Sequence, residues 1–422
     1  GPMSAAPEEP RVAYVISGFP LTFVTSEVDA HQQAGWSILP LSSSAPMPIS
    51  HLSELERSWR KRTVYRPGIA RMAVDVLMAL CRHPIRSLAV LAFVFRLALA
   101  SPSEAIKALY ELGAAAHFAP RCRAFGANLV HVHFASRSLS LGLMLGILLD
   151  RPVTCTTHAF DLYTRPPRGL RFRLTRCAAV ITISTFNRDY LAKVCGWDVA
   201  ERTAVVHCGV DATRFPLVQR GPDARDIVSV TRLTPHKGLH IAIEACRVLR
   251  DRNVSATYRI VGDGEERADL QHRIREAGLS DRVRLEGARP NDQLLDVLAH
   301  SAIFVLPCVT LNNGDHDGIP VALMEAMATG MAVVSTPISG IPELIRHDES
   351  GLLVPERDPV ALADALLRLL EDPALCARLG TGARQQIENA FCATQNAARL
   401  RGILAPFLAF QGSNSRRSTS AS

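Results

Sequence analysis

The chain has 422 residues, 48% of them hydrophobic and 21% charged, a balance that excludes wholesale disorder. This length exceeds what one hydrophobic core usually organises, so we expect two or three domains. The net charge of +7 is unevenly divided: residues 1–210 carry 23 basic and 14 acidic side chains, against 24 and 26 in residues 211–422. The asymmetry predicts two domains with different partners. The basic first domain would meet nucleic acid, an anionic membrane surface or an acidic small molecule.

Four short apolar runs in the first half are bounded by Gly, Pro or polar residues, and a longer helical stretch follows each one. This alternation predicts β-α units that build a parallel sheet. A further strand is expected over residues 205–209, where a turn-rich segment marks the crossover between domains. The four runs are residues 12–17, 129–133, 153–157 and 179–184.

The segment from Arg57 to Arg96 holds nine Lys or Arg residues and one acid, Asp75. Basic residues among Leu, Val and Phe at helical spacing predict interfacial helices that lie on an anionic bilayer. The alternative is an ordinary helical hairpin, split at Pro84, that packs on its domain. Charged residues interrupt the most apolar part, so it lacks the roughly 18–20 apolar residues of a spanning helix.

Five further strands alternate with helices in the second half, and three closing helices follow. We therefore expect an α/β fold with two Rossmann-like, doubly wound domains that face each other across a cleft. Residues 11–210 form the acceptor-binding domain and residues 211–393 the donor-binding domain. Residues 394–410 return to the first domain as a helix, and the Ser- and Arg-rich residues 411–422 form a disordered tail. The strands are residues 227–230, 257–261, 283–285, 302–306 and 332–335, and the first two closing helices are residues 359–371 and 376–391.

The ten cysteines are scattered and form no C-x-x-C pair. Several lie inside apolar runs, which predicts reduced, buried thiols and neither a disulfide framework nor a zinc site. No signal peptide is evident. These features predict a cytoplasmic protein.

A loop rich in Gly and Asp leads into a helix in the second half. Gly318 permits close backbone approach, and Pro320 suits the first helical position. The unpaired N–H groups of Ile319–Val321 then form an anion site suited to a diphosphate. Asp317 and Glu325 are separated by seven residues, so one carboxylate would lie beside the phosphates and the other towards sugar hydroxyls. The alternative is a helix cap with one solvated Glu.

Arg232 and Lys237 follow a predicted strand, five residues apart. Arg grips phosphate oxygens in a fork and Lys adds a point charge, although a solvated loop would have the same composition. Asp315 and Asp317 form a D-x-D pattern, but its place before Gly-Ile-Pro and a helix argues against a metal site. Arg267 occupies the third glycine position of a dinucleotide fingerprint, which argues against a dehydrogenase.

The motifs of the second half, taken in their order along the chain, resemble the retaining family 4 glycosyltransferases, of GT-B fold. The resemblance implies that Arg232 and Lys237 hold the diphosphate of a nucleotide-sugar donor, with Gly262 in the same donor site. It also implies that Asp317, in place of the usual Glu, contacts the transferred sugar and that Glu325 contacts the ribose. The motifs are Arg232-(x4)-Lys237-Gly238, Val261-Gly262-Asp263-Gly264, Gly318-Ile319-Pro320-(x4)-Glu325-Ala326-Met327-Ala328-(x)-Gly330 and Gly340-Ile341-Pro342-Glu343-Leu344.

Motifs of the first half resemble exopolysaccharide glycosyltransferases of the colanic-acid type. They imply that His158 positions the donor sugar and that Asp161 faces the same cleft. His131 and His133 alternate on a strand, so at least one of them is expected to be packing, and His133 is an acceptor-side candidate. The motifs are His131-Val132-His133-Phe134-Ala135, Thr157-His158-Ala159-Phe160-Asp161-Leu162-Tyr163 and Ile183-Ser184-(x2)-Asn187-(x2)-Tyr190-Leu191.

The first loop, from Gly18 to Glu27, resembles the family's first loop but lacks a few residues after its Pro. Gly18 would let this loop approach the donor phosphate or the acceptor, and Glu27 would lie on the acceptor side. Arg165 and Arg168 begin a basic run after the His158 motif. That run is either a solvated helix face or a contact with a lipid diphosphate or phospholipid.

The resemblance as a whole implies a metal-independent, cofactor-free hexosyltransferase of bacterial glycan biosynthesis. It would move a sugar from a UDP- or GDP-linked donor to a lipid-linked or saccharide acceptor, in the cytoplasm or at the inner face of the cell membrane. Two alternatives remain: a nucleotide-sugar epimerase or phosphorylase on the same fold, and a non-catalytic nucleotide-sugar-binding subunit, which the Asp at 317 favours. Nucleic-acid binding is disfavoured, because the basic half carries no recognised motif and little aromatic interleaving.

Overall fold

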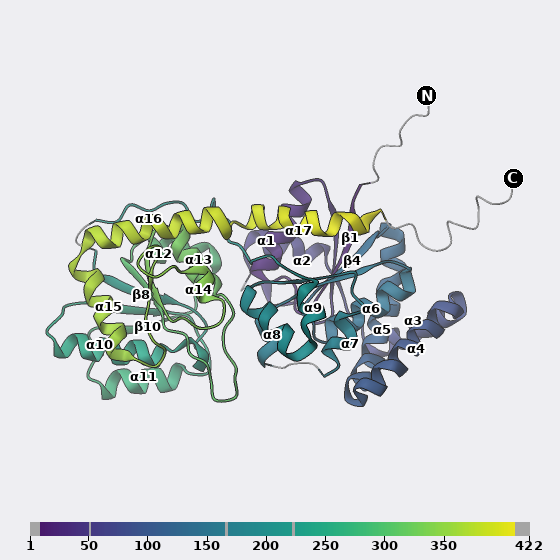
Figure 1. Cartoon of the computed structure of the whole chain (residues 1–422), viewed down its shortest axis with the longest axis horizontal. Coiled ribbons are helices and arrows are strands. Elements are labelled where there is room, and N and C mark those ends of the chain that lie inside the picture. Colours follow the sequence, from purple (N-terminus) through teal and green to yellow (C-terminus); the bar gives the residue numbers. More distant parts are fainter. Residues whose placement is uncertain (1–8, 50–51, 165–167, 222–223, 410–422) are drawn as a thin grey trace, which may run out of the picture. The chain divides into compact units, whose positions relative to one another are not determined.

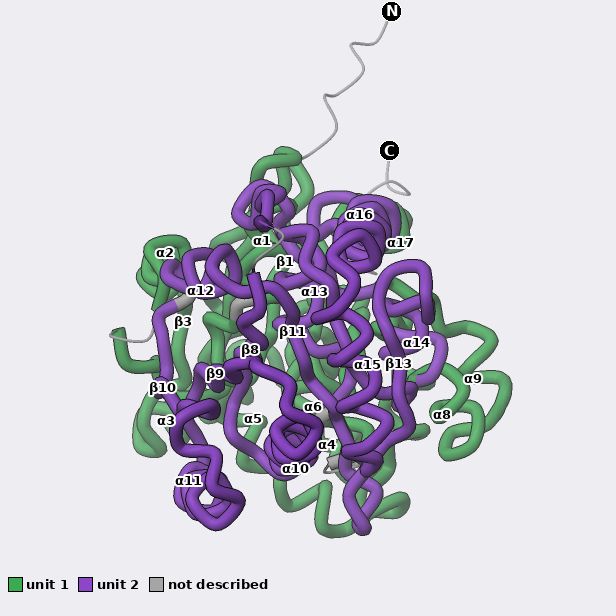
Figure 2. Tube along the Cα trace, turned by 90° about the vertical axis from the view of Figure 1, so that its left-hand side faces the viewer, with its two compact units in different colours: residues 1–183, 187–206, 397–422 green, residues 184–186, 207–396 purple. Residues whose placement is uncertain are grey.

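A computed structural model describes residues 9–49, 52–164, 168–221 and 224–409. The chain divides into two compact units, coloured separately in Figure 2. Unit 1 comprises residues 1–183, 187–206 and 397–422, and unit 2 comprises residues 184–186 and 207–396. The main division thus falls after Val206, four residues before the expected boundary at 210. The expected tail, residues 411–422, lies outside the described residues.

Unit 1 is built on a seven-stranded parallel sheet in the order β3-β2-β1-β4-β5-β6-β7. Figure 1 labels two of its strands, β1 and β4. Two strands have the bounds that the sequence predicts, β4 and β5, but β2 and β3 were not predicted. The expected strand over residues 205–209 is wrong: β7 ends at Val205, and the N–H of Val206 makes the last bond to the neighbouring strand. The strands are β1 Arg11–Ile16, β2 Ser37–Ser42, β3 Val64–Tyr65, β4 Leu129–His133, β5 Val153–Thr157, β6 Ala179–Thr182 and β7 Thr203–Val205.

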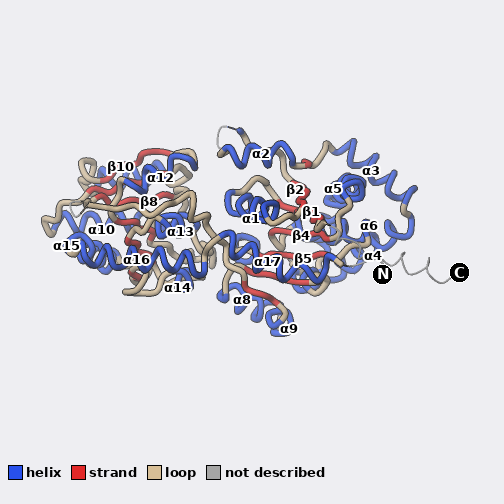
Figure 3. Tube along the Cα trace, turned by 90° about the horizontal axis from the view of Figure 1, so that it is seen from above, coloured by secondary structure: helices blue, strands red, loops and turns tan. Residues whose placement is uncertain are grey.

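Both faces of this sheet are covered by helices, as Figure 3 shows. Alternate residues of β1 enter two different cores, because successive side chains of a strand point to opposite faces. Val12 and Tyr14 pack with Leu400 of helix α17 (Ala393–Leu408), whereas Ala13 and Val15 pack in the core that helices α5 (Pro102–Phe125) and α6 (Arg137–Leu149) cover. The helices that begin in this part of the chain are α1 Thr22–Gln33, α2 Glu54–Arg62, α3 Ile69–Arg82, α4 Pro84–Ala100, α5 Pro102–Phe125, α6 Arg137–Leu149, α7 Leu170–Leu174, α8 Thr185–Cys195 and α9 Trp197–Glu201, with a π-helical turn η2 at Phe160–Thr164.

Unit 2 has a six-stranded parallel sheet in the order β10-β9-β8-β11-β12-β13. Its strands are β8 Asp226–Val230, β9 Thr257–Val261, β10 Val283–Gly287, β11 Ile303–Leu306, β12 Ala332–Ser335 and β13 Leu352–Leu353. Its helices are α10 Leu239–Asp251, α11 Arg267–Glu276, α12 Leu294–Ala299, α13 Val321–Ala328, α14 Ile341–Leu344, α15 Pro359–Glu371, α16 Pro373–Ala390 and the start of α17 Ala393–Leu408, with 3₁₀ turns η3 Pro235–Lys237 and η4 Asn291–Gln293.

The predicted closing helices are present with small changes of boundary. α15 has the predicted bounds. α16 begins three residues earlier than predicted, because the side chain of Asp372 caps it by accepting a hydrogen bond from the N–H of Leu375 at 2.9 Å. α17 ends at Leu408, and the predicted end at residue 410 lies outside the described residues.

The strand order reverses once in each sheet. In unit 1 the chain runs outward from β1 through β2 and then restarts on the other side at β4. In unit 2 the same reversal occurs between β8 and β11. Ligands of open parallel sheets bind at such switch points, outside the carboxyl ends of the strands. Each unit therefore has one place where its fold favours a ligand.

No single helix within the described residues has both the length and the apolar composition to cross a membrane. Taken together, α3 and α4 meet those two criteria, but the chain bends by 119° between them.

Candidate functional site

The switch point of unit 2 brings together two groups that the sequence places 80 residues apart. Lys237 ends the turn η3 after β8, and its ammonium forms an ion pair with the carboxylate of Asp317, in the loop after β11. The two side chains are 13% and 22% exposed. Arg232, five residues before Lys237, is exposed, and its guanidinium forms no ion pair with any described residue. The site thus has one paired and one available cation.

The ion pair fixes the charge state of both partners. Burial by itself lowers the pKa of Lys237, but the adjacent Asp317 carboxylate outweighs burial and raises that pKa above its usual value. Burial likewise raises the pKa of Asp317, while the ammonium of Lys237 outweighs it and lowers that pKa. Both groups are therefore charged at neutral pH.

Helix α13 begins directly after this pair. Pro320 is its N-cap and has extended backbone angles, so the prediction that Pro320 is the first helical residue is wrong by one position. Gly318 and Ile319, just before it, are buried. No side chain caps the helix, so the N–H groups of Val321 and Ala322 at its first turn remain available to an anion.

Glu325 lies within α13 and is only 7% exposed. Burial raises the pKa of this carboxyl to about 7, against a smaller lowering effect of Arg214. The alternative of a solvated Glu is therefore wrong. A buried carboxyl that titrates near neutrality is a recurring property of functional sites.

Two glycines allow the loops of this site to approach each other. Gly238 has φ +67°, and a β-carbon there would overlap the carbonyl oxygen of Pro307 after β11. Gly262, after β9, has φ +147°, and a β-carbon there would overlap the carbonyl oxygen of Thr231 after β8. Both positions require glycine for backbone packing, which gives Gly262 a structural role that the sequence reading did not include.

Glu343, in the fourth motif, also has a structural role. Its carboxylate accepts hydrogen bonds from the backbone N–H groups of Thr185 and Phe186 at 2.9 and 3.2 Å. Nε2 of His207 lies 2.9 Å from the same carboxylate. Glu343 thus links the two segments that make up unit 2, residues 184–186 and 207–396.

The switch point of unit 1 holds a chain of three hydrogen-bonded side chains. Glu27 lies on α1, His133 ends β4 and His158 follows β5. Nε2 of His133 lies 3.0 Å from Oε1 of Glu27, and Nδ1 of His133 lies 3.0 Å from Nε2 of His158. Both histidines are buried. Three residues that the sequence predicts as site residues are therefore in contact.

Asp161 fixes the loop that carries His158. Its two carboxylate oxygens accept the backbone N–H groups of His158 at 2.7 Å and of Ala135 at 2.5 Å. Burial raises the pKa of Asp161 to about 7, although these two bonds act in the opposite direction. Asp161 thus holds the β5 loop against the β4 loop.

His131 is buried beside this chain and belongs to the core. Its two ring nitrogens lie 2.7 and 3.1 Å from the hydroxyls of Thr154 and Thr156 on β5. The ligand atoms of Glu27, His131 and His133 lie within 4.8 Å of one another, close enough to share a cation. The Thr hydroxyls already engage both nitrogens of His131, and this favours a hydrogen-bond network over a metal site.

The basic run after His158 is mostly engaged inside unit 1. Arg173 is wholly buried and pairs with Glu104 at 3.4 Å, so a solvated helix face is wrong for this residue. Arg171 pairs with Asp198 at 2.7 Å. Arg168 is exposed, and Arg165 lies outside the described residues.

Two family models match adjoining parts of the chain. Glycosyltransferase Family 4 matches residues 67–214, and Glycosyl transferases group 1 matches residues 215–386. Together they account for most of the chain, in the order that the motifs predict. The chain belongs to glycosyltransferase family 4.

Curated relatives of this family 4 chain include two enzymes of exopolysaccharide synthesis. It is 46% identical over 194 residues to WcaL, a colanic acid biosynthesis glycosyltransferase of Escherichia coli, over 45% of this chain and 48% of the relative. It is 44% identical over 194 residues to AmsK, an amylovoran biosynthesis glycosyltransferase of Erwinia amylovora, over 46% of this chain and 48% of the relative. The chain thus spans about half the length of the curated relatives it matches.

Solved structures show the fold of this family 4 chain. The Anabaena protein HepE in complex with UDP matches with a TM-score of 0.69 at 17% identity, over 94% of this chain and 100% of that one. Sucrose-phosphate synthase from Thermosynechococcus elongatus matches with a TM-score of 0.68 at 19% identity, over 95% and 99%. The fold is GT-B, with two doubly wound domains.

The expected site residues of this family 4 chain fall into two groups, one in each unit. The unit 2 group has the Lys237–Asp317 pair at its centre, and the unit 1 group has the Glu27–His133–His158 chain. Gly18, in the first loop, has φ +75° and open space around its α-carbon, so its backbone conformation explains the glycine. The sequence reading missed Tyr14, whose hydroxyl donates to Glu27 at 3.0 Å. Its inward position on β1, next to β4, is the signal that could have revealed it.

Proposed function

We propose that this chain is a retaining glycosyltransferase of bacterial exopolysaccharide synthesis. It transfers a hexosyl group from a UDP- or GDP-linked donor to a lipid-linked or saccharide acceptor. The observation that carries the proposal is the convergence of Arg232, Lys237 and the start of α13 at the switch point of unit 2. Family membership and the two exopolysaccharide relatives support it, and retention is the outcome that the resemblance implies.

The cations of unit 2 act on the leaving group. As the bond from the anomeric carbon to the diphosphate breaks, negative charge develops on the diphosphate. Arg232 grips phosphate oxygens in a fork, Lys237 adds a point charge, and the N–H groups of Val321 and Ala322 donate from the end of α13. By analogy with an oxyanion-hole donor, each such group stabilises the transition state by about 3–4 kcal/mol.

The carboxyl groups orient the donor. Asp317, held by Lys237, accepts hydrogen bonds from hydroxyls of the transferred sugar. Glu325, with its pKa of about 7, contacts the ribose. His158 of unit 1 positions the donor sugar, and its neighbours Glu27, His133 and Asp161 support it. Since these groups supply the charge stabilisation, the proposal requires neither a metal nor a cofactor.

The test starts with the intact chain and a panel of UDP- and GDP-sugars. We expect one donor to raise the unfolding temperature, and that donor with a saccharide or lipid-linked acceptor to yield a product of retained anomeric configuration by NMR. Lys237→Ala and Arg232→Ala should lower turnover about 100-fold or more. Arg284→Ala, which removes an exposed arginine of β10 in the same unit, is the matched control and should retain turnover.

The same assay separates the alternatives. Conversion of the nucleotide sugar without any acceptor would identify an epimerase, and a sugar phosphate formed with inorganic phosphate would identify a phosphorylase. Donor binding without product across a broad acceptor panel would identify a binding subunit. Each of these results would refute the transferase proposal.

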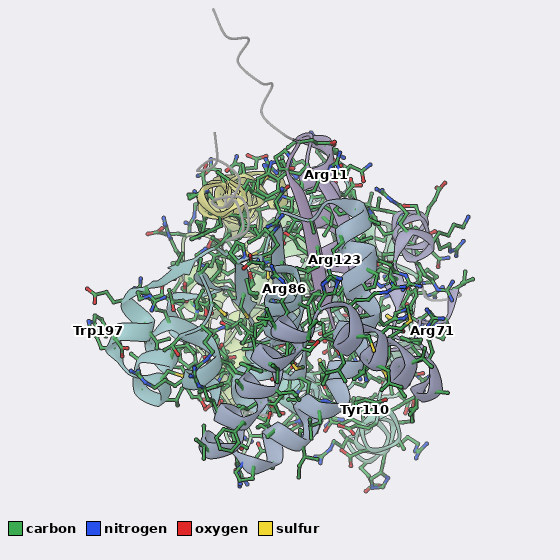
Figure 4. All side chains as sticks on the ribbon, turned by 90° about the vertical axis from the view of Figure 1, so that its right-hand side faces the viewer. Arg11, Arg71, Arg86, Tyr110, Arg123 and Trp197 are labelled. Carbon is green, nitrogen blue, oxygen red and sulfur yellow. The ribbon has the colours of Figure 1, made fainter. Side chains whose placement is uncertain are left out.

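We also propose that unit 1 attaches to an anionic membrane surface through α3, α4 and the start of α5. The exposed apolar residues of α4 follow helical spacing on one face, and its opposite face is buried. Arg71 and Tyr110 label this side of unit 1 in Figure 4. The exposed apolar residues are Ile69, Val74, Leu77, Met78, Leu80, Ile85, Leu88, Leu91, Phe95, Leu99, Ile106, Leu109 and Tyr110.

The charges on this surface have one sign. The three acids between residues 69 and 111, namely Asp75, Glu104 and Glu111, are all buried. Arg82 and Arg96 are exposed and make no ion pair with a described residue. An apolar face with only cations beside it complements an anionic bilayer. The alternative, a hairpin that only packs on its domain, leaves these apolar side chains unexplained.

Vesicle sedimentation tests the attachment. We expect the chain to bind vesicles containing phosphatidylglycerol more tightly than neutral vesicles, and high salt to weaken binding. Arg82→Gln with Arg96→Gln should remove the preference, and Leu88→Ser with Phe95→Ser should remove binding. Trp197→Ser is the matched control, since Trp197 is 68% exposed on α9, away from α3 and α4 (Figure 4). Equal sedimentation of all variants would leave a plain helical hairpin.

A further inference from the structure

The carboxyl ends of three neighbouring strands in unit 1 carry or adjoin the Glu27–His133–His158 chain. β1 and β5 both pair with β4, so the loops after these strands meet at one edge of the sheet. Glu27 and His133 are 106 residues apart in sequence, and His133 and His158 are 25 residues apart. The contacts therefore depend on the fold and are not a local turn.

One end of this hydrogen-bonded set of side chains is the charged carboxylate of Glu27. Burial raises the pKa of Glu27, but His133 and His31 outweigh burial and hold that pKa well below its usual value. Its Oε1 accepts the hydroxyl proton of Tyr14 at 3.0 Å and lies 3.0 Å from Nε2 of His133. An ionised carboxylate can only accept, so Nε2 of His133 carries the proton of that bond.

The position of the proton on His133 determines the position of the proton on His158, because the two rings share a hydrogen bond. In a neutral imidazole with a proton on Nε2, Nδ1 is an acceptor. The proposed arrangement takes His133 as such a neutral imidazole, so that its Nδ1 accepts a hydrogen bond from Nε2–H of His158, 3.0 Å away. Burial, with a smaller effect of His133, lowers the pKa of His158 well below its usual value, so this ring is neutral. Its remaining nitrogen, Nδ1, then carries no proton, and no described residue bonds to it.

We propose that Glu27 and His133 are positioning residues that keep the proton of His158 on Nε2 and leave Nδ1 as an acceptor for a hydroxyl of the donor sugar. The inference rests on the proposed function for the identity of the ligand, but the tautomer itself does not. Asp161 completes the arrangement, because it holds the backbone of His158 at 2.7 Å and so fixes where the ring begins.

The tautomer can be read directly by NMR of the full chain with ¹⁵N-labelled histidine. His158 is assigned by the signals that vanish in His158→Gln. We expect Nε2 of His158 to be protonated and Nδ1 to be unprotonated in the wild type. Glu27→Met removes the acceptor and His133→Phe removes the middle ring, so each should give a mixture of tautomers. Glu27→Gln, whose amide oxygen still accepts, should keep the wild-type tautomer.

Turnover should follow the tautomer. By analogy with the hydrogen-bond partners that orient metal-binding histidines, we expect the donor kcat/KM to fall about 10–100-fold in Glu27→Met and His133→Phe, and to recover in Glu27→Gln. His131→Gln is the matched control: it changes a buried histidine on the same strand whose hydrogen bonds, among the residues that the structure describes, go to Thr154 and Thr156. It should leave the tautomer of His158 unchanged.

Three results would overturn the inference: a wild type with the proton of His158 on Nδ1, a folded Glu27→Met that keeps the wild-type tautomer, or zinc titration that shifts the signals of His131 and His133 together. The first two results would show that Glu27 and His133 do not set the tautomer of His158, and the third would show a metal site in their place. Failure of the proposed function looks different, since the wild type would then turn over no nucleotide sugar while its histidine tautomers could still be read.

Discussion

Replacing Lys237 by Met leaves the carboxylate of Asp317 without its cation. Removal of one partner from a buried ion pair costs about 3–5 kcal/mol. Since the two side chains are 13% and 22% exposed, we expect the lower end of that range, about 3 kcal/mol. In a unit that spans residues 207–396, each kcal/mol lowers the unfolding temperature by about 2–4 °C, so the transition of unit 2 should fall by about 6–12 °C.

The double variant Lys237→Met with Asp317→Asn separates stability from catalysis. It leaves no uncompensated charge, so we expect its unfolding free energy to return to within about 1 kcal/mol of the wild type. Its donor turnover should stay about 100-fold low, because the leaving diphosphate still lacks its cation. Urea unfolding and initial-rate assays on the wild type, both single variants and the double variant measure the two effects.

The pH dependence gives a second check on the pair. The pKa of Asp317 is lowered, so its contribution is present above pH 4 and is lost as the pH falls through the folded value. The pKa of Lys237 is raised, so its contribution persists below about pH 10 and is lost as the pH rises further. Restored turnover in the double variant would refute the catalytic role of Lys237. An undiminished unfolding temperature in Lys237→Met would refute the ion pair.

Three further predictions concern the same unit and the chemistry. Glu325→Ala should lower turnover about 100-fold or more while unit 2 stays folded by circular dichroism. The pKa of Glu325 in the folded chain, about 7, exceeds the unfolded value, so the contribution of Glu325 to stability should fall between about pH 4.5 and 7. Glu325→Gln should abolish that fall in urea unfolding. Gly262→Ala should destabilise unit 2 by more than about 1 kcal/mol in urea unfolding, since the new β-carbon meets the backbone of Thr231, whereas Gly221→Ala, with open space around it, should not. Chelation with EDTA should leave donor turnover unchanged, and activity that returned only with added divalent cation would contradict the metal-independent proposal.

The fold was predictable where the sequence signal is local. β9, β12 and α15 have their predicted bounds, because each is an apolar run or an amphipathic stretch with turn residues at both ends. β3 and β13 have two residues each, too few for any periodic signal. β2 contains Pro40, which weakens a strand pattern, yet it pairs with β1 along six residues.

The site was predictable only in part, for a similar reason. The motif resemblance selected Lys237, Asp317, Glu27, His133 and His158, but spacing along the chain did not indicate which of them touch. Lys237 and Asp317 meet because β8 and β11 are neighbours at a switch point. Contacts of this kind arise from strand order, which no local pattern reports.

The charge asymmetry of the sequence takes on a more specific meaning in the structure. Each acid in the α3–α5 region is buried and shared by two bases: Asp75 by Arg71 and His117, Glu104 by Lys107 and Arg173, and Glu111 by Arg66 and Arg137. The acids therefore pair with the six bases just named, whereas Arg82 and Arg96 have no ion-pair partner in the part of the chain that the structure describes. The surface of unit 1 is for this reason more positive, beside its exposed apolar residues, than the count of charges suggests. A basic surplus that served nucleic acid would gain nothing from a surface lined with Leu, Ile and Phe, whereas an anionic bilayer is complementary to both features.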